Sequence, residues 1–371
     1  MKKFLKKIII FLLPLFILSL TSLIFIKQSG EYFSDIDNLT ESNEDYLIGF
    51  ANDEYRYRYL KWARINNNEK FTALALGSSR VLQFKEDMFD ERFYNAGYTI
   101  ENINEFKDFL ETLPKDKLPK YLIMGIDQWM FNENWSGFSL SNKPKEHWTD
   151  NSFSFDLRRI IDVYKNILDG TFNLYNYDRS LSKIGFNAKF NNTGFRNDGS
   201  MNYGKQINKL INNDVTANDY LFGDTYYRIN NNSDRFEYGE NVSNLGLSKL
   251  RELLKYCFEK NISVIGFLPP FPESVYHKMI KSNNYKYIEK ITPILTEIFI
   301  NYNYEFYDYT SLEKGKTYDN EFIDGFHGSE VTYYRILLDM LNRKSTLNKI
   351  TNKIKIKKKL KNRINNYEIN K

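Results

Sequence analysis

The sequence contains a single cysteine, Cys257, among 371 residues. One cysteine cannot form a disulfide within the chain, even in an oxidising compartment, so no internal covalent cross-link holds the fold. We therefore expect Cys257 to be a buried thiol on a helix.

Histidine is almost as scarce, with only His147, His277 and His327. No spacing of Cys and His, or of two His residues, matches a metal site, so we predict no metal and no cofactor. His147 adjoins Trp148 and His277 begins a predicted helix, so both are expected to be packing or surface residues. His327 is therefore the candidate for acid–base chemistry.

Charge is absent from residues 8–26, a run of 19 positions preceded by four lysines and followed by Lys27. Such a run is long enough to cross about 30 Å of hydrocarbon as a helix. A cleaved signal peptide is the alternative, but its apolar core would be about 7 to 15 residues long and would end at a small-x-small site. Ser22 to Phe25 offers bulky residues there, so we predict an uncleaved signal anchor.

The two sides of this run differ in charge. The lysines precede it, whereas six acidic residues follow within residues 31–45. The positive-inside bias then places the N-terminus in the cytoplasm and the rest of the chain outside the cell membrane, as an extracytoplasmic domain on a single-pass anchor.

Basic residues also gather at the C-terminus. The net charge is +5 overall, +5 over residues 1–27 and +10 over residues 343–371, so the residues between carry −10. An acidic body does not suit nucleic acid, and we predict that none is bound. The basic tail alone is typical of a solvated or membrane-attracted extension.

The predicted organisation has four parts: a cytoplasmic stub and transmembrane anchor at residues 1–27, a stalk and leading helical segment at 28–70, an α/β domain at 71–342, and the basic tail at 343–371. Within the domain, from about 129 to 241, the pattern breaks down into Tyr, Asn, Phe and Gly. We interpret this stretch as an irregular insertion that forms a cap or one wall of the active site.

Five short apolar runs in the domain predict buried parallel strands. They are 71–76, 92–95, 121–124, 262–268 and 304–307. Amphipathic helical patterns lie between or after them, at 100–113, 247–258, 279–302 and 329–341, the last with Ser329 as its N-cap. This alternation predicts a flavodoxin-like, three-layer α/β/α fold around a parallel sheet.

Ligands of such sheets bind at the carboxyl ends of the strands. Gly77-Ser78-Ser79 follows one end, Gly125 a second, and Pro269-Pro270 a third. A serine hydroxyl is a poor nucleophile unless a base lies within hydrogen-bond reach, and Asp324-x-x-His327 can supply a base and the carboxylate that orients it. We therefore predict a serine-type acyl-transfer site of Ser79, His327 and Asp324.

In these residues the chain resembles the SGNH hydrolase family, also called GDSL-like, and in particular its membrane-anchored bacterial branch of acyltransferase-like proteins. The resemblance covers roughly residues 71–341, matches the insertion poorly and rests on four short blocks in the family's order. The blocks are Gly77-Ser78-Ser79, Asn95-Ala96-Gly97, Gly125-Ile126-Asp127-Gln128 and Asp324 to His327. It implies that the amides of Ser79 and Gly97 help to bind the oxyanion.

The third block departs from the family pattern, because Asp127 stands where the family usually has an Asn whose amide donates to the oxyanion. A carboxylate cannot donate unless it is protonated. Either Asp127 is neutral or turned away, or Gln128 supplies the donor, or the enzyme is weak. Arg80 begins the segment after Ser79 and is a further candidate for contact with the oxyanion or substrate.

The resemblance implies transfer or removal of acyl groups, most plausibly acetyl, on a cell-envelope polysaccharide or another envelope polymer. Such relatives often work beside a multipass membrane acyltransferase, which is an implied partner. Two alternatives remain open: a free esterase or lipase, and a catalytically silent binding or scaffold protein on the same fold.

Overall fold

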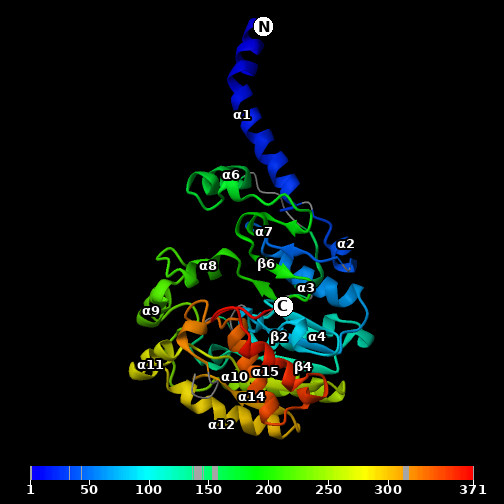
Figure 1. Ribbon diagram of the computed structural model, residues 1–371, viewed down its shortest axis with the longest axis vertical. Coiled ribbons are helices and arrows are strands. Elements are labelled where there is room, and N and C mark those ends of the chain that lie inside the picture. Colours follow the sequence, from blue (N-terminus) through cyan, green and yellow to red (C-terminus); the bar gives the residue numbers. More distant parts are fainter. Residues whose placement is uncertain are drawn as a thin grey trace. The chain divides into compact units, whose positions relative to one another are not determined.

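The computed structural model describes residues 2–32, 34–42, 44–135, 137, 144, 146–152, 158–311 and 317–370. The chain divides into two compact units (Figure 1). Unit 1 comprises residues 1–57, 151–197 and 202–205, and unit 2 comprises residues 58–150, 198–201 and 206–371.

Unit 1 begins with the helix α1 (Lys2–Ser29), which contains the apolar run. Leu, Ile and Phe dominate it, and a helix satisfies the backbone hydrogen bonds that an apolar environment cannot. Among the described helices, α1 alone is long and apolar enough to cross a membrane, judged by length and composition. Most of its large side chains are exposed in the isolated chain.

The rest of unit 1 joins the segment after α1 to part of the predicted insertion. Strand β1 (Leu47–Ile48) pairs parallel with β5 (Lys183–Ile184) and antiparallel with β6 (Gly194–Arg196). The helical elements are α2 (Ile36–Glu41), α6 (Arg158–Leu168), η6 (Leu174–Asn176) and α7 (Phe186–Asn191). A cluster of Ile26, Tyr32, Val163, Phe172, Phe186 and Phe190 forms the core. Residues 151–197 therefore fold with the predicted stalk rather than as an insertion of the α/β domain alone.

Unit 2 is built on a five-stranded sheet in the order β3-β2-β4-β8-β9, and each neighbouring pair is parallel. The strands are β2 (Ala73–Gly77), β3 (Phe93–Gly97), β4 (Tyr121–Gly125), β8 (Ser263–Leu268) and β9 (Glu305–Asp308). All five overlap the apolar runs of the sequence, so the prediction of a parallel α/β sheet is confirmed. This is a doubly wound order, and its direction reverses between β2 and β4.

Helices cover both faces of this sheet, because successive side chains of each strand point to opposite sides. Leu74, Leu122 and Val264 lie in one buried cluster with α4 (Ile103–Thr112), α10 (Asn244–Glu259) and α12 (Lys286–Ile300). Their neighbours Ala75 and Ile123 lie in a second cluster with α14 (Glu330–Asn342) and α15 (Lys353–Lys361). The arrangement is consistent with a three-layer α/β/α fold. Cys257 is buried on α10, as expected.

The remaining elements of unit 2 are short. The α-helices are α3 (Arg56–Asn67, which begins in unit 1), α5 (Glu146–Thr149), α8 (Lys205–Ile211), α9 (Gly223–Asn231) and α11 (Glu273–Lys281). The 3-10 turns are η1 (Ser79–Val81), η2 (Glu86–Met88), η3 (Lys115–Lys117), η4 (Gln128–Phe131), η7 (Tyr220–Phe222), η8 (Asp319–Glu321) and η9 (Thr346–Lys349). Strand β7 (Met201–Asn202) lies where the chain passes from one unit to the other.

One predicted helix is two helices in the structure. The pattern over 279–302 divides into the end of α11 and the whole of α12. Between them Asn283 has a left-handed φ of 57°, which ends a right-handed helix and which Asn tolerates better than most residues. In contrast, Ser329 is the N-cap of α14 as predicted, and it forms a capping box with Thr332.

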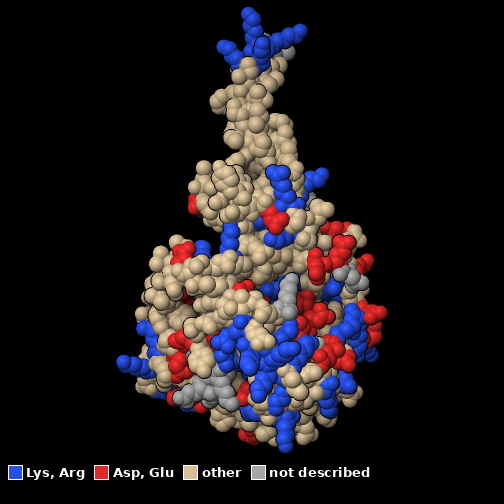
Figure 2. All heavy atoms as spheres, in the orientation of Figure 1, with Lys and Arg blue, Asp and Glu red and all other residues tan. Residues whose placement is uncertain are grey.

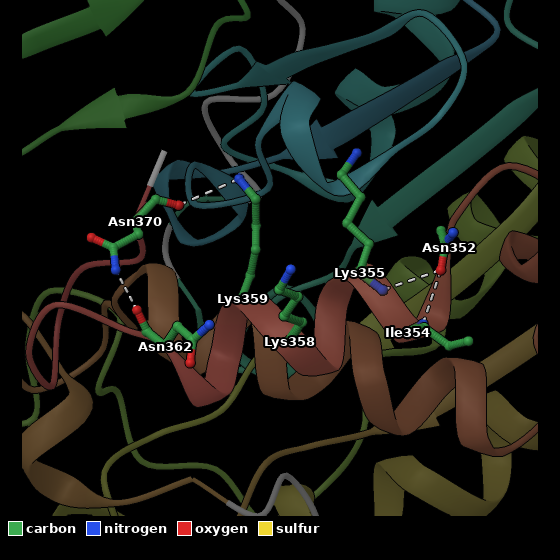
Figure 3. A pocket seen from close by; sticks show the side chains of 7 residues that line it. All are labelled: Asn352, Ile354, Lys355, Lys358, Lys359, Asn362 and Asn370. Carbon is green, nitrogen blue, oxygen red and sulfur yellow. Dashed lines mark hydrogen bonds between the residues drawn. The ribbon is translucent and has the colours of Figure 1, made fainter.

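The C-terminal segment, predicted to be a solvated or membrane-attracted extension, instead packs on the sheet of unit 2. Ile356, Leu360 and Ile369 are buried in the second cluster, whereas the lysines of α15 point outward. Figure 2 shows Lys and Arg gathered over this part of unit 2. The lysine stems and Asn352, Asn362 and Asn370 surround an open hollow of about 580 Å³ (Figure 3).

The packing of α15 can be tested with two isoleucines of the same helix. Ile356→Ala should lower the free energy of unfolding by about 2–5 kcal/mol, because it removes a fully buried side chain. Ile354→Ala, where the side chain is exposed, should change it by less than about 0.5 kcal/mol. Denaturant titration of the detergent-solubilised protein measures both, and equally small effects would contradict the packed arrangement.

Candidate active site

The site lies at the carboxyl ends of the strands, at the point where the strand order reverses. Gly77, the last residue of β2, pairs with Gly97 of β3 and Gly125 of β4. The turn η1 lies directly against these glycines: a Cβ at Gly125 would come within 2.2 Å of Val81 Cγ1. Glycine at the strand ends therefore lets the turn that carries Ser79 lie directly on the sheet.

Ser79 is the first residue of η1. The preceding Ser78 caps this turn, because its hydroxyl accepts a hydrogen bond from the amide of Arg80 at 3.2 Å. Ser78 is buried, whereas Ser79 is partly exposed. Of the two neighbouring serines, Ser79 is therefore the one that solvent or a substrate can reach.

The structure brings together the three residues predicted to carry the chemistry. Ser79 Oγ lies 2.7 Å from His327 Nε2, and His327 Nδ1 lies 2.7 Å from Asp324 Oδ2. A carboxylate at Nδ1 fixes the proton on that nitrogen and leaves Nε2 free to accept the hydroxyl proton of Ser79. His327 and Asp324 both remain partly exposed. The geometry meets the distance requirement for a serine, a base and an orienting carboxylate.

Asp324 is held in place by its own loop. Its Oδ1 accepts hydrogen bonds from the amides of Phe326 and His327, at 3.0 and 2.8 Å. Burial alone would raise the pKa of Asp324, but the charge of His327, the hydrogen bond to its ring and these two amides together lower the pKa below its ordinary value. Asp324 is therefore a stable anion beside the imidazole.

A second aspartate, Asp219, supports this loop from the predicted insertion. Its Oδ2 accepts hydrogen bonds from the Gly325 amide at 2.8 Å and from the Thr225 hydroxyl at 2.6 Å. Gly325 also lies so close to Thr225 that a Cβ there would come within 2.2 Å of its hydroxyl oxygen. Sequence reasoning missed Asp219, because no local spacing connects it with a loop 106 residues away.

Arg80, predicted to contact an oxyanion or substrate, occupies the interior instead. Its side chain is buried, and each of its five N–H groups has an acceptor within the protein. The acceptors are the carbonyls of Phe326, Pro269 and Pro270 and the side chains of Asp127 and Gln128, at 2.6 to 3.2 Å. Arg80 thus joins the turn of Ser79 to the loop of His327 and leaves no donor for a substrate.

Asp127 is the counter-ion of this guanidinium. Its Oδ1 lies 3.2 Å from Arg80 Nη1, and both side chains are buried. Burial raises the pKa of Asp127, and the charge of Arg80 and the hydroxyl of Ser78 offset part of that effect. Burial likewise lowers the pKa of Arg80, and Asp127 opposes this. These are the directions expected of a desolvated ion pair.

Two further donors predicted for the oxyanion also have protein partners. The side-chain amide of Gln128 donates to the Pro269 carbonyl at 2.7 Å and to the Thr310 hydroxyl at 3.1 Å. The amide of Gly97 donates to Asn95 Oδ1 at 2.8 Å. In this arrangement Gln128 does not replace the missing Asn, and Gly97 does not present a free amide.

The other two histidines lie away from Ser79. His147 is buried with its ring against Trp148, and His277 is exposed beside Glu273. Within the described ranges, no group of three or more His, Cys, Asp or Glu side chains is placed to hold a metal ion.

Comparison with known proteins gives no family for this chain. No family model matches the sequence, and no curated protein and no solved structure matches it either. The residues of the site are therefore what indicates a function for this chain.

The Arg80–Asp127 pair can be measured with a double-mutant cycle. Arg80→Met should destabilise the protein by about 3–5 kcal/mol, because it leaves a buried carboxylate without its cation. Asp127→Asn removes that charge, so the double variant should lose less than the sum of the single variants, by at least about 1 kcal/mol. Denaturant titration gives the three values, and strict additivity would contradict the ion pair.

The lowered pKa of Asp324 predicts a pH-dependent contribution to stability. A carboxylate whose pKa is lower in the folded state stabilises the fold above its unfolded-state pKa of about 3.9 and loses this contribution as the pH falls further. Wild type should therefore exceed Asp324→Asn in stability above about pH 5, and the difference should shrink below about pH 4. A difference that stayed constant or widened toward acid pH would count against the stabilised anion.

Proposed function

We propose that this protein is a membrane-anchored serine esterase or O-acyltransferase of the SGNH type. Ser79 is the nucleophile, His327 the general base and then the general acid, and Asp324 the group that orients His327. The observation that carries the proposal is the continuous chain of two 2.7 Å contacts from Ser79 Oγ through the imidazole to Asp324, between residues 248 positions apart in the sequence.

The reaction would proceed through an acyl-enzyme. His327 Nε2 takes the hydroxyl proton as Ser79 Oγ attacks the carbonyl of an ester, and the protonated imidazole returns that proton to the departing alcohol. In the second half, His327 takes a proton from water or from an acceptor hydroxyl as its oxygen attacks the acyl carbon, and the imidazolium then gives that proton to Ser79 Oγ as the acyl–Oγ bond breaks. Asp324 stays ionised throughout and stabilises the imidazolium.

Stabilisation of the oxyanion is expected to limit the rate. Loss of one donor typically costs about 3–4 kcal/mol of transition-state stabilisation. Gly97, Gln128 and Arg80 donate to protein acceptors, so the amide of Ser79 is what remains of the predicted set. We therefore expect a slow enzyme, or one in which substrate binding frees the Gly97 amide from Asn95.

The proposed substrates are acyl groups, most plausibly acetyl, of a cell-envelope polysaccharide or another envelope polymer. Helix α1, which is long and apolar enough to span a bilayer, supports the anchor. The lysines before it and the acidic residues after it support an extracytoplasmic domain. A multipass membrane acyltransferase is the proposed partner, as the acyl donor's source on the same membrane.

A second candidate function is a catalytically silent binding or scaffold protein on the same fold. The observation that favours it is the engagement of the Gly97 and Gln128 amides by Asn95, Pro269 and Thr310. The contacts of Ser79, His327 and Asp324 oppose it, because a scaffold needs no hydroxyl aligned with an imidazole.

A fluorophosphonate probe separates the two functions. Wild-type protein should be labelled at Ser79, and Ser79→Ala and His327→Ala should each lose at least about 99% of the labelling rate, as expected when an activated serine or its base is removed. In-gel fluorescence measures the rate, and mass spectrometry of the labelled peptide separates Ser79 from the adjacent Ser78.

The matched control is His277→Ala, which removes an exposed histidine outside the site and should label like wild type. Absence of labelling in folded wild-type protein would overturn the enzymatic proposal and favour the scaffold. Hydrolysis and transfer are then distinguished by comparing free acid with acylated acceptor after incubation with an acetyl ester and a polysaccharide.

A further inference from the structure

Helix α6 packs against the part of α1 that is apolar enough to lie in a membrane. The Tyr164 hydroxyl donates to the Leu18 carbonyl at 2.6 Å and lies 2.6 Å from the Thr21 hydroxyl. The Ser22 hydroxyl donates to the Ile160 carbonyl at 3.1 Å. In Figure 1, α6 lies beside the lower, C-terminal part of α1. Both helices belong to unit 1.

These contacts lie well inside the apolar run. At 1.5 Å per residue, the 19 residues Ile8–Ile26 measure about 28 Å, close to the hydrocarbon thickness of a bilayer. Leu18 and Ser22 then lie about 12 Å and 6 Å along the helix from the C-terminal end of that run. If Ile8–Ile26 fills the bilayer, the side of α6 that touches α1 lies within the same layer, at the depth typical of interfacial helices.

The outward stripe of α6 has the composition that such a position requires. Its exposed residues are Arg158, Ile161, Lys165 and Leu168, which repeat at helical spacing. Ile161 is 67% and Leu168 is 86% exposed. Val163, on the other side, is buried in the core of unit 1. Apolar side chains between long cationic ones, which can reach up to head groups, are typical of a helix lying in a membrane interface.

The segment after α6 also exposes large apolar side chains. Tyr175 is 99% and Leu181 is 95% exposed, and with Leu168 they are the most exposed large hydrophobic side chains among the described residues outside α1. The ring of Tyr177 lies 5.0 Å from that of Phe25, near the end of the apolar run. Water is a costly environment for large apolar side chains that are this exposed.

We infer that α6, with the segment 174–181, inserts into the bilayer interface beside α1, so that unit 1 is seated in the membrane and not merely tethered above it. Lipid is the occupant that the contacts favour, because Leu18, Thr21 and Ser22 cannot lie in hydrocarbon while the helix packed against them stays in water. The inference depends on the membrane anchor proposed above and is independent of the proposed chemistry.

The test is the depth of spin labels in the full chain reconstituted in liposomes. Ile161→Cys and Leu168→Cys are labelled with a nitroxide, and the native Cys257 provides the background because it is buried. For each label, the measured quantity is the collision rate with oxygen divided by the collision rate with a water-soluble nickel chelate. This ratio should be severalfold higher at both positions than at Tyr227→Cys. Tyr227, on α9, is matched to Ile161 because its exposure is also 67%.

A label at Leu13→Cys reports on α1 itself. If Leu13 is in lipid but the labels at 161 and 168 behave like the one at 227, α6 is in water and the inference fails. If the labels at 161 and 168 are shielded from both oxygen and the nickel chelate, protein and not lipid covers α6, and the inference fails as well. If Leu13 is also in water, the anchor fails together with it, whereas the outcome of the fluorophosphonate experiment stands apart from all three results.

Discussion

The geometry of the site depends on one buried cation. Arg80 follows Ser79 directly, and its five hydrogen bonds reach residues after β4, residues after β8 and the carbonyl next to His327. A guanidinium that has lost its water must find an acceptor for every N–H and a charge of opposite sign nearby. The hydrogen bonds and the ion pair of Arg80 fix the relative positions of the ends of β2, β4 and β8. They also fix the loop that carries His327. Arg80 adjoins Ser79, and Phe326 adjoins His327. The hydrogen bond from Arg80 to the Phe326 carbonyl therefore holds the hydroxyl and the imidazole together.

This constraint gives a physical reason for an aspartate at position 127. An asparagine would offer a neutral oxygen to Arg80 and leave a buried positive charge uncompensated. The carboxylate neutralises the pair but, as an anion, cannot donate a hydrogen bond to a developing oxyanion. The carboxylate at position 127 and the buried position of Arg80 are therefore one feature, in which a possible oxyanion donor is replaced by the counter-ion of a buried guanidinium.

Sequence patterns predicted the strands, the main helices and the grouping of Ser79, His327 and Asp324, because buried runs, helical periodicity and short motifs are local signals. Contacts across long separations were not predictable: Arg80 bonds to residues 189 to 246 positions away, and Asp219 to one 106 away. Position-specific packing also has no local signal in the sequence. The many lysines around Ile356 and Leu360 indicated a solvated segment, although both side chains are buried. Composition alone did not predict the break at Asn283, and no local pattern assigned residues 151–197 to unit 1.

Ser79 and His327 lie 248 positions apart, and this separation sets the time between their synthesis. A ribosome adding roughly 5–20 residues per second needs about 12 to 50 s to make that interval. The Glu330 carboxylate, three residues beyond His327, accepts a hydrogen bond from the amide of Ile369 at 3.1 Å. The first residue of α14 therefore gains this hydrogen bond only after residue 369 has been made. Until residue 327 has been made, the nascent chain contains the Ser79 hydroxyl without the imidazole that lies 2.7 Å from it in the folded protein.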